Sequence, residues 1–233
     1  MSEKPTLKLD WCSHEAAKYA VEHWHYSHCM PMGKLNTIGV WENEKYIGAV
    51  IYGYGATADL LTPYGLTMHE GCELVRIALN KHHTPVSKIL MISIKMLKIK
   101  NPGLRLIVSF ADPGEGHHGG IYQATNWVFS GDSAGCNFYR DKSGKLWHPR
   151  RVSPDPNNRE KYIKTYDCER VWRPGKHRYL MPLDDAMRKQ IEPLRKPYPK
   201  RGTGETDNAP GTNPETGGAS PTVPLSVIQD GNR

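Results

Sequence analysis

The sequence predicts an α/β fold, a mixed β-sheet flanked by helices. The main observation is a βαβ unit over residues 73–111, where an amphipathic helix separates two apolar strands. A helix and a hairpin precede this unit, and a second helix and strand follow it. A βαβ connection gives parallel strands and a hairpin gives antiparallel ones, so together they predict a mixed sheet.

The first 55 residues contain a strand, a helix and a hairpin. Leu7–Trp11 is predicted to be a short strand, and Ser13 to cap a helix that ends at about Trp24. Two apolar strands, Thr37–Trp41 and Tyr46–Tyr52, surround four polar residues, which is a hairpin signal.

The βαβ unit begins with the strand Glu73–Leu79. Thr84 is expected to be the N-cap, and Pro85 the first residue, of a helix that continues over 86–100. Leu104–Ala111 is nearly all apolar, as expected of a strand buried on both faces. We expect these strands to form a right-handed parallel crossover.

Beyond the βαβ unit the chain becomes richer in glycine. Residues 116–120 form a glycine-rich turn, a helix begins at Ile121, and a strand lies near Trp127–Ser130. Residues 201–233 are rich in Gly, Pro, Thr, Asn and Ser and contain no aromatic residue, so they bury too little apolar area to offset their ordering entropy. We expect one domain over residues 1–200 and a disordered C-terminal tail.

The composition argues against membrane and disulfide-rich proteins. No stretch approaches the ~20 continuous apolar residues of a membrane helix, and the first ten residues lack the apolar core of a signal peptide. The 5 cysteines are scattered, odd in number and without a CxxC pair. We therefore expect a cytoplasmic protein with no membrane partner.

Positive charge is concentrated in one segment. Residues 140–201 carry 18 Lys and Arg against 8 Asp and Glu, whereas residues 1–139 are neutral overall. Binding a polyanion through such a segment releases counterions, although a solvated surface also accounts for it. Interleaved aromatic residues such as Trp147 and Trp172 favour nucleic acid. The expected DNA contacts within 140–200 are Arg140, Lys142, Lys145, Arg150 and Arg151.

Ligands of open α/β sheets gather beyond the carboxyl ends of parallel strands. The first strand of the βαβ unit leads there to two histidines and to a helix N-terminus, whose N–H groups and dipole favour an anion. The expected substrate-binding or donor-binding residues at this place are His82, His83, Thr84, Ser87 and Lys88.

The second strand ends near Ser109 and leads to Asp112. A carboxylate here can take a proton from an amine or orient it, and it can equally cap a turn. His117 and His118 in the next turn can contact phosphate or, as a weak signal, a metal ion. Tyr122 can direct its hydroxyl into the same cleft or be a hydrogen-bonded core residue.

Two further places carry polar groups among apolar ones. Glu73 and Arg76 share a strand, and their spacing of three predicts opposite faces, where each needs a partner or a substrate. His25 and Tyr26 belong to the histidine-rich segment 23–28 at the end of the first helix. Histidines there can simply complement the helix dipole, but the density of His, Tyr and Ser makes this a second candidate for catalysis.

Several motifs, in order along the chain, resemble those of the phage Mom family. They are His25-Tyr-Ser27, Pro31-Met-Gly-Lys34, Ile38-Gly-Val-Trp-Glu42, Cys72-Glu-Leu-Val-Arg76, Thr84-Pro-Val-Ser87, Ser109-Phe-Ala-Asp-Pro113 and Gly116-His-His-Gly-Gly-Ile-Tyr-Gln-Ala124, with Trp127. Together they cover about residues 10–180.

The resemblance implies an enzyme of the host-cell cytoplasm that converts adenine N6 in double-stranded phage DNA to N6-carbamoylmethyladenine and so protects it from restriction. It also implies the fold of the GCN5-related N-acetyltransferases. Family functional positions correspond to His25, Tyr26, Glu73, Arg76, Asp112 and Tyr122, and Ser109 is added on position. Iron has been linked to the family, and His25 is the first ligand to test.

The hypothesis that follows gives Asp112 the role of base or orienter of the adenine amine, with Tyr122, His25 and Tyr26 near the reacting centre. Glu73 and Arg76 hold the donor or shape the cleft. The target base must leave the duplex stack, since its amine is otherwise paired.

One departure bears on the donor. Acetyltransferases of this fold bind the coenzyme A pyrophosphate with a Q/R-x-x-G-x-G/A loop, and the corresponding residues 81–88 contain no glycine. The donor therefore stays open between an acyl-CoA-like and a glycine-derived molecule. An acyl-CoA-dependent N-acetyltransferase of a small amine or protein and a non-catalytic DNA-binding module remain the alternatives, and the oligomeric state is open.

Overall fold

The computed structural model describes residues 5–55, 58–149, 152–153, 163–164 and 168–200. The strands of its main body are β1 (Leu7–Trp11), β2 (Leu35–Glu42), β3 (Lys45–Gly53), β4 (Gly71–Leu79), β5 (Leu106–Ala111), β6 (Val128–Asp132) and β12 (His177–Pro182). They form a seven-stranded sheet in the order β1-β2-β3-β4-β5-β12-β6.

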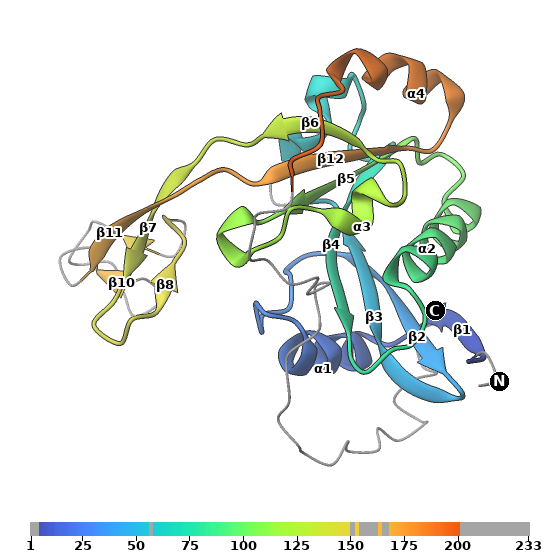
Figure 1. Cartoon of the computed structure of the whole chain (residues 1–233), viewed down its shortest axis with the longest axis horizontal. Coiled ribbons are helices and arrows are strands. Elements are labelled where there is room, and N and C mark those ends of the chain that lie inside the picture. Colours follow the sequence, from blue (N-terminus) through green and yellow to red (C-terminus); the bar gives the residue numbers. More distant parts are fainter. Residues whose placement is uncertain (1–4, 56–57, 150–151, 154–162, 165–167, 201–233) are drawn as a thin grey trace.

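Within this sheet β4 and β5 are parallel, and every other neighbouring pair is antiparallel. The helices are α1 (His14–Trp24), α2 (Val86–Lys100), α3 (Gly120–Gln123) and α4 (Asp185–Ile191) (Figure 1). The predicted mixed sheet flanked by helices is confirmed. The predicted C-terminal tail lies outside the described residues.

Helix α1 covers one face of the sheet over β2, β3 and β4. It packs small residues, among them Ala16 and Ala20, against Ala49 and Ala78, which allows a close approach of helix and strands. The predicted N-cap is confirmed, because Ser13 Oγ accepts a hydrogen bond from the Ala16 N–H at 3.2 Å.

Helix α2 packs on the opposite face, where Ile89 and Leu90 join the cluster that contains Val50 and Ile77. The prediction of its start was wrong by one residue. Pro85 is the N-cap rather than the first helical residue, and it makes no side-chain capping bond.

Helix α4 lies on the same face as α1, above the other half of the sheet. Met187 and Ile191 pack on Leu106, Val108 and Leu180. Neither α4 nor β12 was predicted from the sequence. No helix in the described part of the chain is long and apolar enough to cross a membrane.

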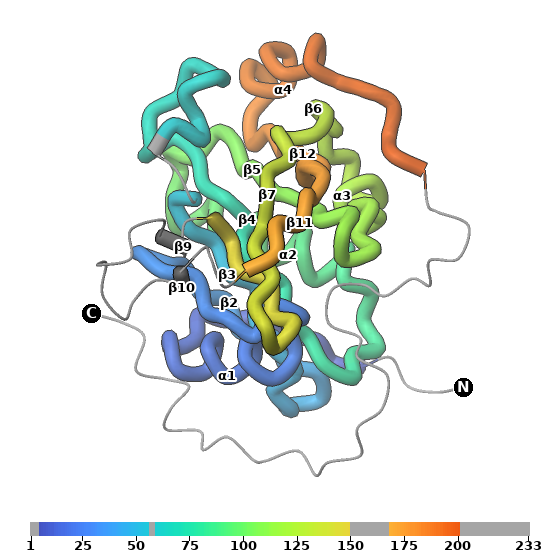
Figure 2. The backbone as a smooth tube through the Cα atoms, turned by 90° about the vertical axis from the view of Figure 1, so that its left-hand side faces the viewer, coloured from blue at the N-terminus to red at the C-terminus, as the bar shows by residue number. Residues whose placement is uncertain are grey.

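A second, three-stranded sheet projects from the body. It consists of β7 (Cys136–Arg140), β8 (Leu146–Trp147) and β11 (Glu169–Arg173), in the order β11-β7-β8. We call these three strands the arm. Figure 1 shows the arm extending to the left, and in Figure 2 it comes toward the viewer in front of the body. Two short strands, β9 (Val152–Ser153) and β10 (Ile163–Lys164), pair with each other in parallel.

Candidate functional site

The parallel strands β4 and β5 are paired over only part of their length. The pairing extends from Gly71 with Leu106 to Leu74 with Ser109 and then stops. Ser109 Oγ donates a hydrogen bond of 2.9 Å to the Leu74 carbonyl at this last paired position. The sheet is therefore split beyond it, between the second half of β4 and the end of β5.

A bulge in β4 lies beside the split. Ile51 pairs with Arg76 and Tyr52 with Leu74, so Val75 is an extra residue in β4. Leu74 and Ile77 both belong to the core under α2, which shows that the alternation of faces shifts between them. The prediction that Glu73 and Arg76 face opposite sides was wrong, because the bulge brings both onto the other face.

A cavity of about 1450 Å³ occupies the split and extends toward the arm. Its walls come from the segment after α1, from β4, from the start of α2, from the loop after β5 and from β7. Of the predicted site residues, those that line it are His25, Tyr26, Glu73, Arg76, His82, Ser87, Asp112, His117, His118 and Tyr122. Ser109, His83, Thr84 and Lys88 do not line it.

His25 is a buried histidine in the wall of this cavity, with 4% of its surface exposed. Its Nδ1 accepts a hydrogen bond from the Ser27 N–H at 3.1 Å, so the neutral ring carries its proton on Nε2. Burial, followed by the positive charge of Arg76, lowers the pKa of His25 to about 3. At neutral pH His25 is therefore an uncharged donor through Nε2–H.

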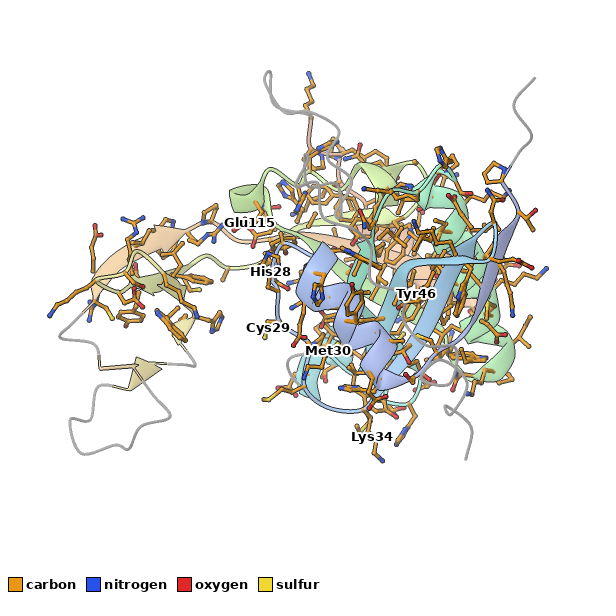
Figure 3. The ribbon with its side chains drawn as sticks, turned by 90° about the horizontal axis from the view of Figure 1, so that it is seen from below. His28, Cys29, Met30, Lys34, Tyr46 and Glu115 are labelled. Atoms are coloured by element: carbon orange, nitrogen blue, oxygen red, sulfur yellow. The ribbon has the colours of Figure 1, made fainter. Side chains whose placement is uncertain are left out.

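Tyr26 also lines the cavity, where its ring packs between those of His25 and His117. Its ring centroid lies 4.3 Å from that of His25 and 5.2 Å from that of His117. Burial raises the pKa of Tyr26, so its hydroxyl is protonated at neutral pH. The segment that follows carries Cys29 and Met30 along the cavity, and Figure 3 labels both at the edge of the body that faces the arm.

Asp112 follows β5 and is held by contacts from several directions. Its Oδ1 accepts a hydrogen bond from the Gly114 N–H at 3.0 Å, which confirms the turn-capping role. Lys176 Nζ lies 3.2 Å from Oδ2, and Arg173 lies 3.6 Å from Oδ1. Only 12% of the Asp112 side chain is exposed.

Arg173 and Lys176 were not predicted as site residues. They belong to the basic segment, whose charge was assigned as a whole to DNA binding. The pairing of β12 with β5 brings them back beside Asp112, and a contact of this range leaves no local signal in the sequence.

Tyr122 and Ser109 form a buried hydroxyl pair at the split, with an O···O distance of 2.8 Å. Since the single Ser109 proton is donated to the Leu74 carbonyl, Tyr122 donates to Ser109 Oγ. Burial raises the pKa of Tyr122. Tyr122 thus lines the cavity while its hydroxyl is held by Ser109.

Arg76 places a cation in the cavity wall. Its Nη1 donates to the Val75 carbonyl at 2.8 Å, a bond that the bulge makes available. Its buried Nε has no hydrogen-bond partner among the described residues. A buried N–H group without a hydrogen-bond partner destabilises the folded protein, so Arg76 Nε is suited to donate a hydrogen bond to an acceptor on a bound molecule.

The loop before α2 is occupied by one of the protein's own carboxylates. Glu42, 4% exposed, accepts hydrogen bonds from the His83 N–H at 2.8 Å and the Thr84 N–H at 2.5 Å. Burial alone raises the pKa of Glu42, but these bonds outweigh it and hold the pKa below its ordinary value. Two amides of the predicted anion site are therefore already used.

Those predicted DNA-contacting residues that the structure describes lie on or next to the arm. Arg140 ends β7 and pairs with Glu169 of β11 at 3.0 Å. Lys142 and Lys145 are exposed in the turn between β7 and β8, and Lys145 lies 4.3 Å above the Trp147 ring. Arg150 and Arg151 lie outside the described residues.

His25 was also the predicted iron ligand. The described residues include no group of three or more His, Cys, Asp or Glu side chains placed to hold a metal ion. His25 Nδ1 is already bonded to Ser27, and positive charge from Arg76 and Lys176 acts on its ring. The described side chains therefore do not fit a resident iron ion.

Comparison with known proteins gives a family and several distant structural likenesses. FeeM, an N-acyl amino acid synthase from uncultured soil microbes, is 10% identical and aligns over 82% of this chain and 96% of its own, with a TM-score of 0.47. An acetyltransferase from Thermus thermophilus is 11% identical over 77% of this chain and 100% of its own, with a TM-score of 0.40.

A putative acetyltransferase from Acinetobacter baylyi is 12% identical over 85% of this chain and 100% of its own, with a TM-score of 0.43. At these TM-scores the likenesses add nothing about activity. No curated protein matches the chain. The model of the Mom protein family matches residues 6–200, most of the chain, and the protein therefore belongs to the Mom protein family.

Proposed function

We propose that this protein converts adenine N6 in double-stranded DNA to N6-carbamoylmethyladenine. Membership in the Mom family supports a DNA-modifying role and a transferase. The observation that carries the proposal is Asp112, a carboxylate set between two cations in the wall of a large cavity that also contains His25, Tyr26 and Tyr122.

In the proposed reaction Asp112 orients the amine. The N6 lone pair forms a bond to the methylene carbon of an activated carbamoylmethyl donor. The bond between this carbon and the leaving group breaks, and the leaving group takes the electron pair. The proton lost from N6 passes to Asp112 or, through it, to water.

The donor is proposed to bind in the split between β4 and β5. Arg76 brings a cation and an unpartnered buried N–H there, and neutral His25 brings a second donor. These groups suit a donor with carboxylate or carbonyl oxygens, as a glycine-derived molecule has. Glu42 occupies the amides of His83 and Thr84, which argues against a diphosphate bound at that loop.

The arm is proposed to contact the DNA. The turn between its strands β7 and β8 carries the exposed side chains of Lys142 and Lys145, and Trp172 on β11 is 65% exposed. Cations beside exposed aromatic rings are suited to the backbone and bases of nucleic acid.

Mass spectrometry of nucleosides from plasmid DNA, isolated from cells that express the chain, tests the proposal. We expect deoxyadenosine with the added mass of one carbamoylmethyl group, absent with Asp112→Asn. Asp10→Asn is the matched control, since this exposed carboxylate on β1 also pairs with a lysine, Lys8. Unmodified DNA from well-folded wild-type protein contradicts the proposal and favours the N-acetyltransferase alternative.

A further inference from the structure

We infer that the arm side of the cavity is the subsite for the extrahelical adenine, and that Phe138 is the surface on which this base stacks. This inference rests on the proposed function, since it takes a DNA adenine as the substrate. Phe138 is not among the site residues or DNA contacts predicted from the sequence.

Phe138 reaches the cavity through the alternation of β7. Cys136 and Phe138 both line the cavity, whereas Asn137 and Tyr139 between and after them do not. The arm therefore has one face toward the cavity and one face away from it. His148, which follows β8, also lines the cavity, and its ring lies edge-on to Phe138 with centroids 5.2 Å apart.

Arg173 connects Phe138 to the candidate reacting group. Its guanidinium carbon lies 5.5 Å from the centroid of the Phe138 ring. The same guanidinium lies 3.6 Å from Asp112 Oδ1 and 2.9 Å from Glu115 Oε1. One side chain thus contacts both the ring and the carboxylate, which places Phe138 near Asp112. A base that stacks on Phe138 beside this guanidinium, or in its place, has its edge toward Asp112.

The groups at that edge complement adenine. Asp112 is an acceptor for the N6 amine, and Lys176 Nζ, 3.2 Å from it, is a donor for a neighbouring ring nitrogen. Guanine and thymine present a carbonyl oxygen where adenine has its amine, and this oxygen faces the carboxylate unfavourably. The pair Asp112 and Lys176 therefore selects against guanine and thymine.

Binding of a displaced base tests the inference without a donor. The probes are a duplex with one bulged adenine, the same duplex with a bulged thymine, and the uninterrupted duplex. We expect wild-type protein to bind the bulged adenine about tenfold more tightly than the uninterrupted duplex, as stacking of one base on an aromatic ring allows. The bulged thymine should give a smaller gain.

Phe138→Leu should reduce the preference for bulged adenine to about twofold or less, while affinity for the uninterrupted duplex stays as in wild type. Phe138→Tyr keeps an aromatic face and should keep the preference. Tyr139→Leu is the matched control for this preference, measured as the ratio of the two affinities. Tyr139 is a neighbouring aromatic on the face of β7 shared with Trp147 and does not line the cavity. Circular dichroism and thermal melting verify that each variant is folded.

The outcomes separate the inference from the proposed function. If wild-type protein modifies plasmid DNA but Phe138→Leu keeps the full preference for bulged adenine, the inference is overturned and the proposed function stands. If the wild type neither binds duplex nor modifies DNA, the proposed function fails, and the inference fails with it.

Discussion

Lys176 Nζ lies 3.2 Å from Asp112 Oδ2, and this contact joins the base of the arm to the end of β5. Lys176 stands between β11 of the arm and β12 of the body, and Arg173 of β11 reaches the same carboxylate. Any shift of the arm therefore changes the surroundings of Asp112. In the proposed function, these two cations link the DNA-contacting arm to the carboxylate that orients the amine.

Lys176→Met should lower the rate of adenine modification by about 10²-fold, because Asp112 loses a partner that positions it. Lys176→Arg, which keeps the charge, should recover part of the rate. The measurement is the initial rate of modified deoxyadenosine formation at equal protein level. Lys189→Gln, an exposed lysine on α4, is the control, and a Lys176→Met variant of wild-type rate contradicts the positioning role.

His25 should stay neutral down to about pH 3 in the folded protein, since its pKa is lowered to about 3 from 6.5. Nitrogen chemical shifts of the imidazole check this directly, with the proton expected on Nε2 between pH 5 and 8. An imidazolium signal in that range contradicts it.

The same shift predicts how stability depends on pH. Below pH 6.5 the unfolded chain binds a proton that the folded chain does not, so the free energy of unfolding decreases as the pH falls from 6.5 toward 3. In urea unfolding, His25→Gln should lose less stability than wild type between pH 7.5 and 5. Equal losses in the two proteins would show that burial does not suppress protonation of His25.

Ser109 and Tyr122 can be separated by two conservative substitutions. Ser109→Ala leaves the Tyr122 hydroxyl and the Leu74 carbonyl without this partner and should lower the free energy of unfolding by about 1–3 kcal/mol. Tyr122→Phe leaves the Ser109 bond to Leu74 intact and should cost about 0.5–1.5 kcal/mol. If Tyr122 acts near the reacting centre, Tyr122→Phe loses activity far beyond this change, and an active Tyr122→Phe protein assigns the hydroxyl to structure.

Glu42→Gln should lower the free energy of unfolding by about 1.5–3 kcal/mol at pH 7, because two amide bonds to a carboxylate are weakened. The pKa of Glu42 is held below its ordinary value, so its contribution is present above pH 4.5 and is lost as the pH falls through the lowered pKa. Chemical unfolding at pH 7 and pH 3.5 should show the gap between wild type and variant narrowing. A constant gap contradicts the carboxylate's role.

The exposed lysines next to the arm should make DNA affinity depend on salt concentration. Lys142→Gln and Lys145→Gln together should reduce the slope of log affinity for duplex DNA against log salt concentration by about 2. Fluorescence anisotropy titrations at salt concentrations between about 50 and 200 mM give this slope. An unchanged slope places the DNA elsewhere on the molecule.

Much of the body of the fold, though not β12 or α4, could be predicted because its elements are local. The Ser13 cap, the hairpin and the βαβ unit each depend on neighbouring residues and recur in the structure. The arm could not be predicted in the same way, since its strands are short and the paired residues of β11 and β7 are 29 to 37 positions apart in the sequence. Helix α4 is only seven residues long, which weakens its periodicity.

The candidate site also contains residues that could be predicted from the sequence and residues that could not. Residues at strand ends, such as Asp112 and His82, could be predicted because the carboxyl edge of a parallel pair is a general site. The orientation of Arg76 could not, because one extra residue in β4 reverses the alternation and nothing in the pattern marks it. Glu42 was missed as a partner of the 83–84 amides because 41 residues separate Glu42 from His83.

The split between β4 and β5 has a consequence for the order of events. Its cavity is lined both by the start of α2 and by β7 of the arm. The cavity is large enough to hold two reactants at the same time, so transfer needs no covalent enzyme intermediate. Such a protein should follow sequential rather than ping-pong kinetics, with initial-rate lines for donor and DNA that intersect instead of running parallel.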